Sequence, residues 1–164
     1  MPSRVVTLTV NGEQREFLAQ PGMNLLTALR ERLGLTAAKQ GCAQGTCGTC
    51  TVVLDGKAVF ACLVPVETID GAQVETLEGL ATNGSLDPIQ EAFIDGFATQ
   101  CGFCTSGMIM AAKALLAENS EPTRNDVIRA ISGNVCRCTG YGAIIDAILD
   151  AAARIRSSRR EATT

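Results

Sequence analysis

Cysteine is the residue type with which this sequence could do chemistry. The 164 residues include eight cysteines and no histidine. The absence of histidine excludes Ser-His-Asp and Cys-His catalysis, Rieske centres, histidine-ligated haem and Cys₂His₂ zinc sites. The cysteines fall into two groups of four, the number that a tetrathiolate metal site requires. The first group is Cys42, Cys47, Cys50 and Cys62, and the second group is Cys101, Cys104, Cys136 and Cys138.

The composition indicates a folded protein rather than a disordered chain, a membrane-spanning protein or a nucleic-acid binder. Hydrophobic residues make up 46% of the chain, charged residues make up 19%, and the formal net charge is -3. The apolar runs fall far short of the ~18 residues that a membrane span needs. An acidic balance with 4% aromatic residues argues against a nucleic-acid partner. The N-terminus shows no export signal, so we expect a cytoplasmic protein, in which clustered cysteines are metal ligands more often than disulfides.

The spacing of the first group indicates an iron–sulfur site. Cys42-x₄-Cys47-x₂-Cys50 has the spacing of plant-type [2Fe–2S] ferredoxins, which need a fourth cysteine further along the chain. A loop around a cluster brings backbone N–H groups close to sulfur, which favours glycine. The glycines in this segment are Gly41, Gly45 and Gly48. The alternatives are a zinc tetrathiolate, or a disulfide with free thiols, but zinc ribbons usually have two C-x₂-C pairs and this group has one.

A predicted hairpin supplies the fourth cysteine. Asp55-Gly56 is typical of a two-residue turn between two strands. Counting back from that turn places Cys62 beside Thr49 and Cys50, at the distance of directly opposed strand residues.

The second group lies between predicted helices. Cys101 and Cys104 fall between two helices, and Cys136 and Cys138 fall between two others. In an up-and-down bundle these two connections lie at the same end, so the four thiols can converge. Cys104 and Cys138 each precede a helix, whose N-terminus favours an anionic group. The spacing alone predicts a metal site without naming the metal, and zinc remains open.

The first half of the sequence predicts a sheet with one helix. Alternating apolar residues and the turn Asn11-Gly12 predict a first hairpin. Asn24 can cap a helix that ends at Gly34 and buries Leu25, Leu26, Leu29 and Leu33. The expected strands cover residues 6–10, 15–18, 51–54, 58–62 and 74–77.

The second half of the sequence predicts a bundle of four helices. The polar segment 81–85 marks the domain boundary, and after it the apolar period changes from two to about 3.6. Asp87 caps the first helix, whose buried face would be Ile89, Phe93 and Phe97. The other three helices are expected at 106–118, 124–132 and 141–156.

Several segments together resemble one known family. They are Leu29–Thr36, Gly41–Val52, Asp55-Gly56 with Cys62, Gln100–Met108 and Gly133–Tyr141. In these segments and their order the chain resembles the small iron–sulfur subunit of the molybdenum hydroxylases, the xanthine oxidase and bacterial carbon-monoxide and aldehyde dehydrogenase family. The segments cover nearly the whole chain except its C-terminal end.

The resemblance implies an α+β fold with two domains. These are an N-terminal β-grasp, plant-type ferredoxin-like domain in residues 1–80 and a C-terminal four-helix-bundle domain in residues 86–156. The resemblance does not cover residues 157–164, which we expect to form a solvated, partly frayed tail. The alternative is that the arginines of the C-terminal end dock on an acidic partner surface. Each domain would bind one [2Fe–2S] cluster through its four cysteines.

The resemblance also implies partners and an electron path. Electrons would pass from a molybdopterin centre in a large subunit through the C-terminal cluster and then the N-terminal cluster to FAD in a medium subunit. Gln100 and Cys138 match positions that contact the pterin in this family. We therefore expect an electron-transfer subunit of a hetero-oligomeric oxidoreductase, for example a dimer of heterotrimers, with no catalytic residue of its own.

Two residues depart from the family pattern, and two alternatives remain. Ser106 stands where the family usually has proline, and Ala43 stands where an acidic residue is common. We expect neither change to alter the ligands. The alternatives are a redox-inert protein with two zinc sites and a stand-alone ferredoxin with two clusters.

Overall fold

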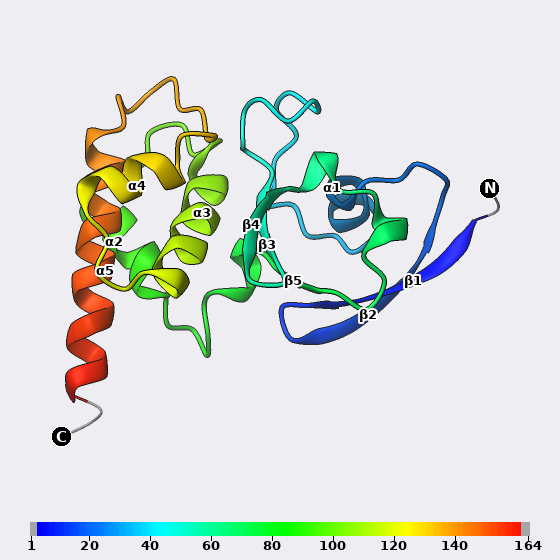
Figure 1. Cartoon of the computed structure of the whole chain (residues 1–164), viewed down its shortest axis with the longest axis horizontal. Helices are drawn as coiled ribbons and strands as arrows, with labels where there is room; N and C mark the ends of the chain where they lie inside the picture. The colour runs from blue at the N-terminus through cyan, green and yellow to red at the C-terminus, as the bar shows by residue number, and fades with distance from the viewer. Residues whose placement is uncertain (1–2, 162–164) are drawn as a thin grey trace.

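A computed structural model describes residues 3–161 of the chain and shows two halves side by side (Figure 1). The N-terminal half is built on a sheet, and the C-terminal half is built from helices. Each half has its own cluster of buried apolar side chains. No helix within residues 3–161 has the length and apolar character needed to cross a membrane.

The N-terminal half contains one mixed sheet of five strands in the order β2-β1-β5-β3-β4. The strands are β1 (Arg4–Val10), β2 (Glu13–Ala19), β3 (Thr51–Leu54), β4 (Lys57–Phe60) and β5 (Gln73–Glu75). β1 pairs antiparallel with β2 and parallel with β5, and β3 pairs antiparallel with β4 and β5. Both predicted hairpins are confirmed, because the turn residues Asn11-Gly12 and Asp55-Gly56 have the positive φ that such turns require. The last strand ends at Glu75, two residues before its predicted end.

The predicted helix after Asn24 is shorter and less regular than expected. Asn24 caps it, since its side chain accepts the N–H of Thr27 at 2.9 Å. One α-helical turn, α1 (Leu25–Thr27), passes into a π-helical turn, η1 (Ala28–Arg32). The N–H of Leu33 reaches back to the carbonyl of Ala28, which is the wider hydrogen-bonding pattern of a π-helix.

The C-terminal half contains four longer helices, as predicted. They are α2 (Pro88–Asp95), α3 (Thr105–Glu118), α4 (Arg124–Ala130) and α5 (Gly142–Glu161). Capping boxes at Asp87 and Thr123 start α2 and α4. Two short 3₁₀ turns, η2 (Ala61–Leu63) and η3 (Val66–Thr68), lie between β4 and β5. A third, η4 (Leu77–Gly79), lies between β5 and α2.

Two expectations for the helical half are wrong. Phe97 is 86% exposed, because α2 ends at Asp95 and the chain then turns away. The N–H of Ala98 bonds to the carbonyl of Phe93 and the N–H of Phe97 bonds to that of Ile94, which is a Schellman motif. The tail predicted from residue 157 is helical as far as Glu161, and its residues 162–164 lie outside the described part of the chain.

The two halves touch along α3 and the β3–β4 hairpin. Val53 of β3 belongs to the buried cluster of the helical half. Lys113 on α3 forms an ion pair with Glu75 on β5 at 2.9 Å. Ser106 is one of the two residues that depart from the family pattern, and its buried hydroxyl donates to the carbonyl of Ala37 at 2.6 Å.

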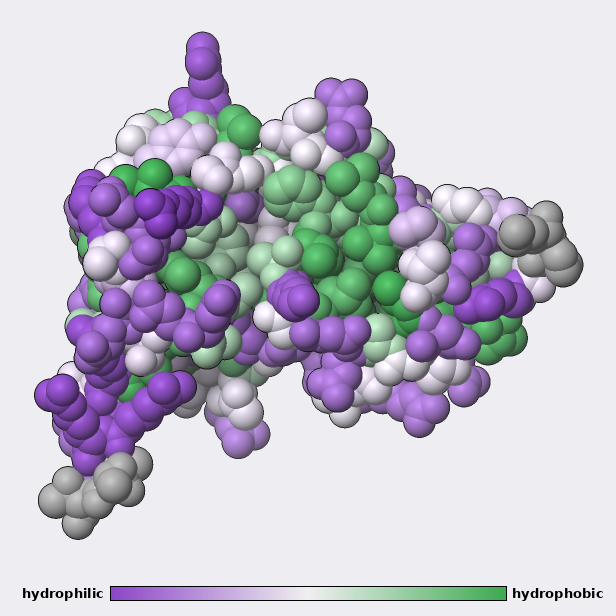
Figure 2. Space-filling view, in the orientation of Figure 1, coloured by the Kyte–Doolittle hydropathy of each residue, from purple (hydrophilic) through white to green (hydrophobic). Residues whose placement is uncertain are grey.

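The surface differs between the two halves. On the face shown in Figure 2, hydrophobic residues gather over β4 and the neighbouring α1 region, whereas hydrophilic residues cover the C-terminal part of α5.

Candidate metal centres

All cysteines of both groups lie in connections or short turns at one edge of the molecule. The loop between η1 and β3, the α2–α3 connection and the α4–α5 connection all reach the upper edge of the view in Figure 1. The fold therefore presents two groups of thiols next to each other rather than at opposite ends.

The hairpin register brings Cys62 to the first loop, as the sequence predicts. Thr51 pairs with Phe60, and the N–H of Ala61 donates to the carbonyl of Cys50 at 3.2 Å. Cys62 follows in η2, and its thiol hydrogen-bonds with that of Cys50. The thiols of the first group thus form a buried pair, Cys50 with Cys62. The other two members, Cys42 and Cys47, form a second hydrogen-bonded pair.

The protein environment of Cys42 favours a negatively charged sulfur. The Thr46 side chain and the N–H groups of Gln44 and Thr46 hydrogen-bond to its sulfur, and they lower the pKa of the Cys42 thiol to about 6. The two N–H groups lie 3.5 and 3.3 Å from that sulfur. The pKa of the Cys50 thiol shifts in the other direction, because burial raises it to about 11.

The second group also forms two pairs. The sulfurs of Cys101 and Cys138 lie 3.6 Å apart, and both residues are exposed. Cys104 and Cys136 are buried, and their thiols hydrogen-bond to each other. Cys104 is the N-cap of α3, so the N-terminus of that helix lies at the site, as the sequence predicts.

The surroundings shift the pKa values of the buried pair, Cys104 and Cys136, in opposite directions. Burial raises the pKa of Cys104 to about 12. Burial also acts to raise the pKa of Cys136, but hydrogen bonds from the side chain and backbone of Thr139 and from the backbone of Cys138 outweigh it and lower the pKa to about 7. The favoured thiolate of the pair is therefore Cys136.

Pairing of the thiols matches the chemistry of a two-iron centre. A [2Fe–2S] cluster takes four cysteines, two on each of its irons, whereas a structural zinc ion needs four donors around one atom. Each group supplies four thiols as two pairs. Within residues 3–161 no three cysteine, aspartate or glutamate side chains gather closely enough to hold a single metal ion. The donor set and its arrangement fit a cluster in each group.

Direct hydrogen bonds join the two cysteine-bearing loops. The N–H of Val135 donates to the carbonyl of Cys47 at 2.9 Å. The side chain of Asn134 is buried and donates to the carbonyl of Gly48 at 2.8 Å. A Cβ on Gly107 would collide with that same carbonyl, so α3 also approaches the first loop closely.

Gln100, the other residue expected at the site, is exposed beside Cys101 at the outer end of the second group. Three exposed apolar side chains lie within a few residues of the cysteines of this group in the sequence. Phe97 is 86% exposed, Phe103 is 47% exposed and Val135 is 52% exposed.

Three polar residues that hold the cysteine-bearing loops are not identified by the sequence patterns. Asn134, Thr139 and Tyr141 all hydrogen-bond at the two sites. Their signal in the sequence is that polar side chains lie within three residues of ligand cysteines, but the partner of each is fixed only by the fold.

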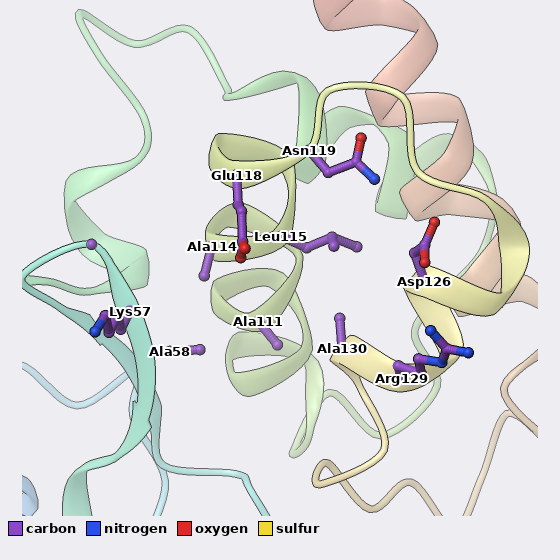
Figure 3. A pocket seen from close by; sticks show the side chains of 11 residues that line it. Lys57, Ala58, Ala111, Ala114, Leu115, Glu118, Asn119, Asp126, Arg129 and Ala130 are labelled. Atoms are coloured by element: carbon purple, nitrogen blue, oxygen red, sulfur yellow. The ribbon is translucent and has the colours of Figure 1, made fainter.

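A separate groove of about 630 Å³ lies between the β3–β4 hairpin and helices α3 and α4 (Figure 3). Its polar side chains are those of Lys57, Glu118, Asn119, Asp126 and Arg129. No cysteine lines this groove, so it has no part in either metal centre.

Comparison with known proteins agrees with this description. The family described as "2Fe-2S iron-sulfur cluster binding domain" matches residues 8–81, and that described as "[2Fe-2S] binding domain" matches residues 76–149. The chain is 46% identical to the nicotinate dehydrogenase small FeS subunit of Eubacterium barkeri, over 83% of this chain and 87% of that protein. It is 44% identical to the xanthine dehydrogenase iron-sulfur-binding subunit of Escherichia coli O157:H7, over 90% and 95% of the two chains.

A solved structure shares the whole fold. The crystal structure of quinoline 2-oxidoreductase from Pseudomonas putida 86 contains a chain that superposes with a TM-score of 0.90 at 44% identity, covering 94% of this chain and 97% of that one. Likeness of this extent, together with two paired sets of four cysteines, shows that the chain belongs to the small iron–sulfur subunits of the molybdenum hydroxylase family.

Proposed function

We propose that this chain is the electron-transfer subunit of a molybdopterin-dependent hydroxylase or dehydrogenase. Electrons would pass from the molybdenum centre of a large subunit through two [2Fe–2S] clusters to FAD in a medium subunit. Oxidation of the substrate belongs to the molybdenum-binding partner, and this chain contributes no catalytic residue. The complex would be a cytoplasmic hetero-oligomer, for which a dimer of heterotrimers is one arrangement.

Within the chain, we propose a β-grasp ferredoxin-like domain in residues 1–80 and a helical domain in residues 86–156. Each cluster would supply one-electron redox chemistry when bound. The eight cysteines would be the ligands, one group for each cluster. The backbone N–H groups of Gln44 and Thr46 would stabilise the negative charge on the sulfur of Cys42. Gly41 leaves room for the sulfur of Cys47, which would lie 2.8 Å from a Cβ at that position.

The observation that carries this proposal is the hydrogen bond between the N–H of Val135 and the carbonyl of Cys47. Cys47 is a proposed ligand of the first cluster, and Val135 directly precedes Cys136, a proposed ligand of the second. The backbone of one proposed ligand is therefore hydrogen-bonded to the residue that precedes another. This contact supports the proposal, because it would hold the two centres close to each other, as a relay requires.

The exposed end of the second group is the proposed docking site for the large subunit. Cys101 and Cys138 are exposed, whereas Cys104 and Cys136 are buried, so the second cluster would have one accessible side. Gln100 and Cys138 would contact the pterin there. Phe97, with 86% of its surface exposed, would supply apolar contact with the partner.

Purification of the complex tests this function. The chain would carry an affinity tag and be isolated anaerobically from the organism that encodes it. The molybdenum, flavin and iron contents of the purified sample would then be measured, and the chains that accompany it would be identified. We expect two larger chains, with molybdenum and FAD in proportion to this chain. Iron-containing protein that elutes alone, without molybdenum or flavin, would instead indicate a stand-alone ferredoxin.

A further inference from the structure

The side chain of Thr139 lies at a proposed ligand of the second cluster. Its Oγ1 is 3.2 Å from the sulfur of Cys136. The same oxygen accepts the N–H of Tyr141 at 3.2 Å, and the hydroxyl oxygen of Tyr141 in turn accepts the N–H of Cys136 at 2.9 Å. These three residues form a closed ring of contacts, which fixes the orientation of Thr139 toward the sulfur.

The hydroxyl proton of Thr139 has one partner in this ring. A metal-bound cysteine is a thiolate and has no proton to donate. The oxygen of this hydroxyl, Oγ1, already accepts a hydrogen bond from the N–H of Tyr141. The proton therefore points at the sulfur, and Thr139 is the donor.

We propose that the Thr139 hydroxyl donates a hydrogen bond to the ligand sulfur of Cys136 and thereby raises the reduction potential of the second cluster. The inference rests on the proposed function, because it requires Cys136 to ligate a cluster. Reduction adds one electron to the cluster and moves no proton, so negative charge on the ligand sulfurs increases. A hydrogen bond to sulfur stabilises that added charge, and burial of Cys136 strengthens the bond.

Two other threonines beside proposed ligands, Thr49 and Thr105, lack this arrangement. Thr49 lies 3.3 Å from the sulfur of Cys47, but its hydroxyl donates to the carbonyl of Lys39 at 3.1 Å. Thr105 follows Cys104, and its hydroxyl pairs with that of Thr99 at 3.1 Å. Thr105 therefore offers a matched control, a threonine that is next to a ligand but bonded elsewhere.

The test is an EPR-monitored redox titration of the purified complex with Thr139→Val, Thr139→Ser and Thr105→Val. Thr139→Val should make reduction of the second cluster roughly tenfold less favourable, which corresponds to a midpoint lower by about 59 mV for one electron. Thr139→Ser keeps the hydroxyl, and Thr105→Val removes one that does not reach sulfur. Both should leave this midpoint unchanged, and the first cluster should titrate alike in all samples.

An unchanged midpoint in Thr139→Val, with the second cluster assembled, would overturn the inference. Should that variant fail to assemble the cluster, Thr139→Ala replaces it, with ENDOR of the reduced protein in D₂O as a second readout. The variant should lose one exchangeable deuteron coupling that the wild type and Thr139→Ser both show, and equal couplings would also overturn the inference. Absence of a second cluster signal from the wild type would refute the proposed function itself.

Discussion

The side-chain amide of Asn134 donates a hydrogen bond of 2.8 Å to the backbone carbonyl of Gly48. Asn134 precedes Cys136 of the second group by two residues, and Gly48 lies between Cys47 and Cys50 of the first group. The same amide donates to the hydroxyl of Thr51 at 2.9 Å, and that hydroxyl donates to the Gly48 carbonyl at 2.7 Å. This buried network fixes the position of one ligand loop against the other.

Asn134→Ala should destabilise the protein and loosen the contact between the centres. The change leaves the Gly48 carbonyl and the Thr51 hydroxyl short of a buried partner, which costs about 1–3 kcal/mol. Denaturation followed by cluster absorbance measures the loss, and the magnetic coupling between the two reduced clusters reports the separation. Asn119→Ala, which removes an exposed acceptor for the N–H of Glu121, should cost less. Equal costs for the two variants would contradict this role of Asn134.

Gly107→Ala should also destabilise the contact between the halves, for a steric reason. Its Cβ would collide with the carbonyl oxygen of Gly48 and lie 3.1 Å from the amide nitrogen of Asn134. Overpacking of this kind costs about 1–3 kcal/mol. Gly142→Ala is the matched control, because Gly142 starts α5 and a Cβ there meets nothing within 4 Å. The control should be neutral or stabilising by about 0.4–1 kcal/mol in the same denaturation assay.

Much of the local structure follows from short-range signals in the sequence. Asn11-Gly12 and Asp55-Gly56 predict both hairpins, and the register of the second one places Cys62 correctly. Asp87 predicts the start of its helix, since a capping box depends on residues within one turn. The spacing of Cys42, Cys47 and Cys50 is likewise a short-range signal.

The features that depend on tertiary contacts are the ones that the sequence leaves undetermined. The apolar period predicts burial of Phe97, but a Schellman motif turns it to the surface two residues after the helix ends. The partner of Asn134 is Gly48, far away in the sequence, and no local pattern identifies it. The close approach of Gly107 to the first loop is likewise visible only in the folded chain.

Cys62→Ser should remove the first cluster and spare the second. Cys62 pairs with Cys50, and the other group lies on different connections. We expect loss of one EPR signal and of about half of the iron, because each [2Fe–2S] cluster holds two irons. Cys101→Ser is the mirror control, which should remove the other signal. Loss of both signals in Cys62→Ser would show that the two sites do not assemble independently.

Phe97→Gly and Phe97→Ala should separate backbone strain from partner binding. Phe97 has a φ of 48°, a conformation that costs a non-glycine residue about 1–2 kcal/mol. Glycine at this position should raise the melting temperature of the isolated subunit, whereas alanine keeps the strain and should not. Both variants lose the exposed ring and should bind the large subunit more weakly, as measured by co-purification. Undiminished assembly of both variants would exclude Phe97 from the interface.

The most direct test of the account is the EPR spectrum of the anaerobically purified protein after reduction with dithionite, together with its metal content. We expect two distinct S = 1/2 signals and about four irons per chain, from two [2Fe–2S] clusters. A colourless sample without an EPR signal and with zinc bound to the cysteines would contradict it, and would show that the chain keeps the fold of its relatives without their redox chemistry.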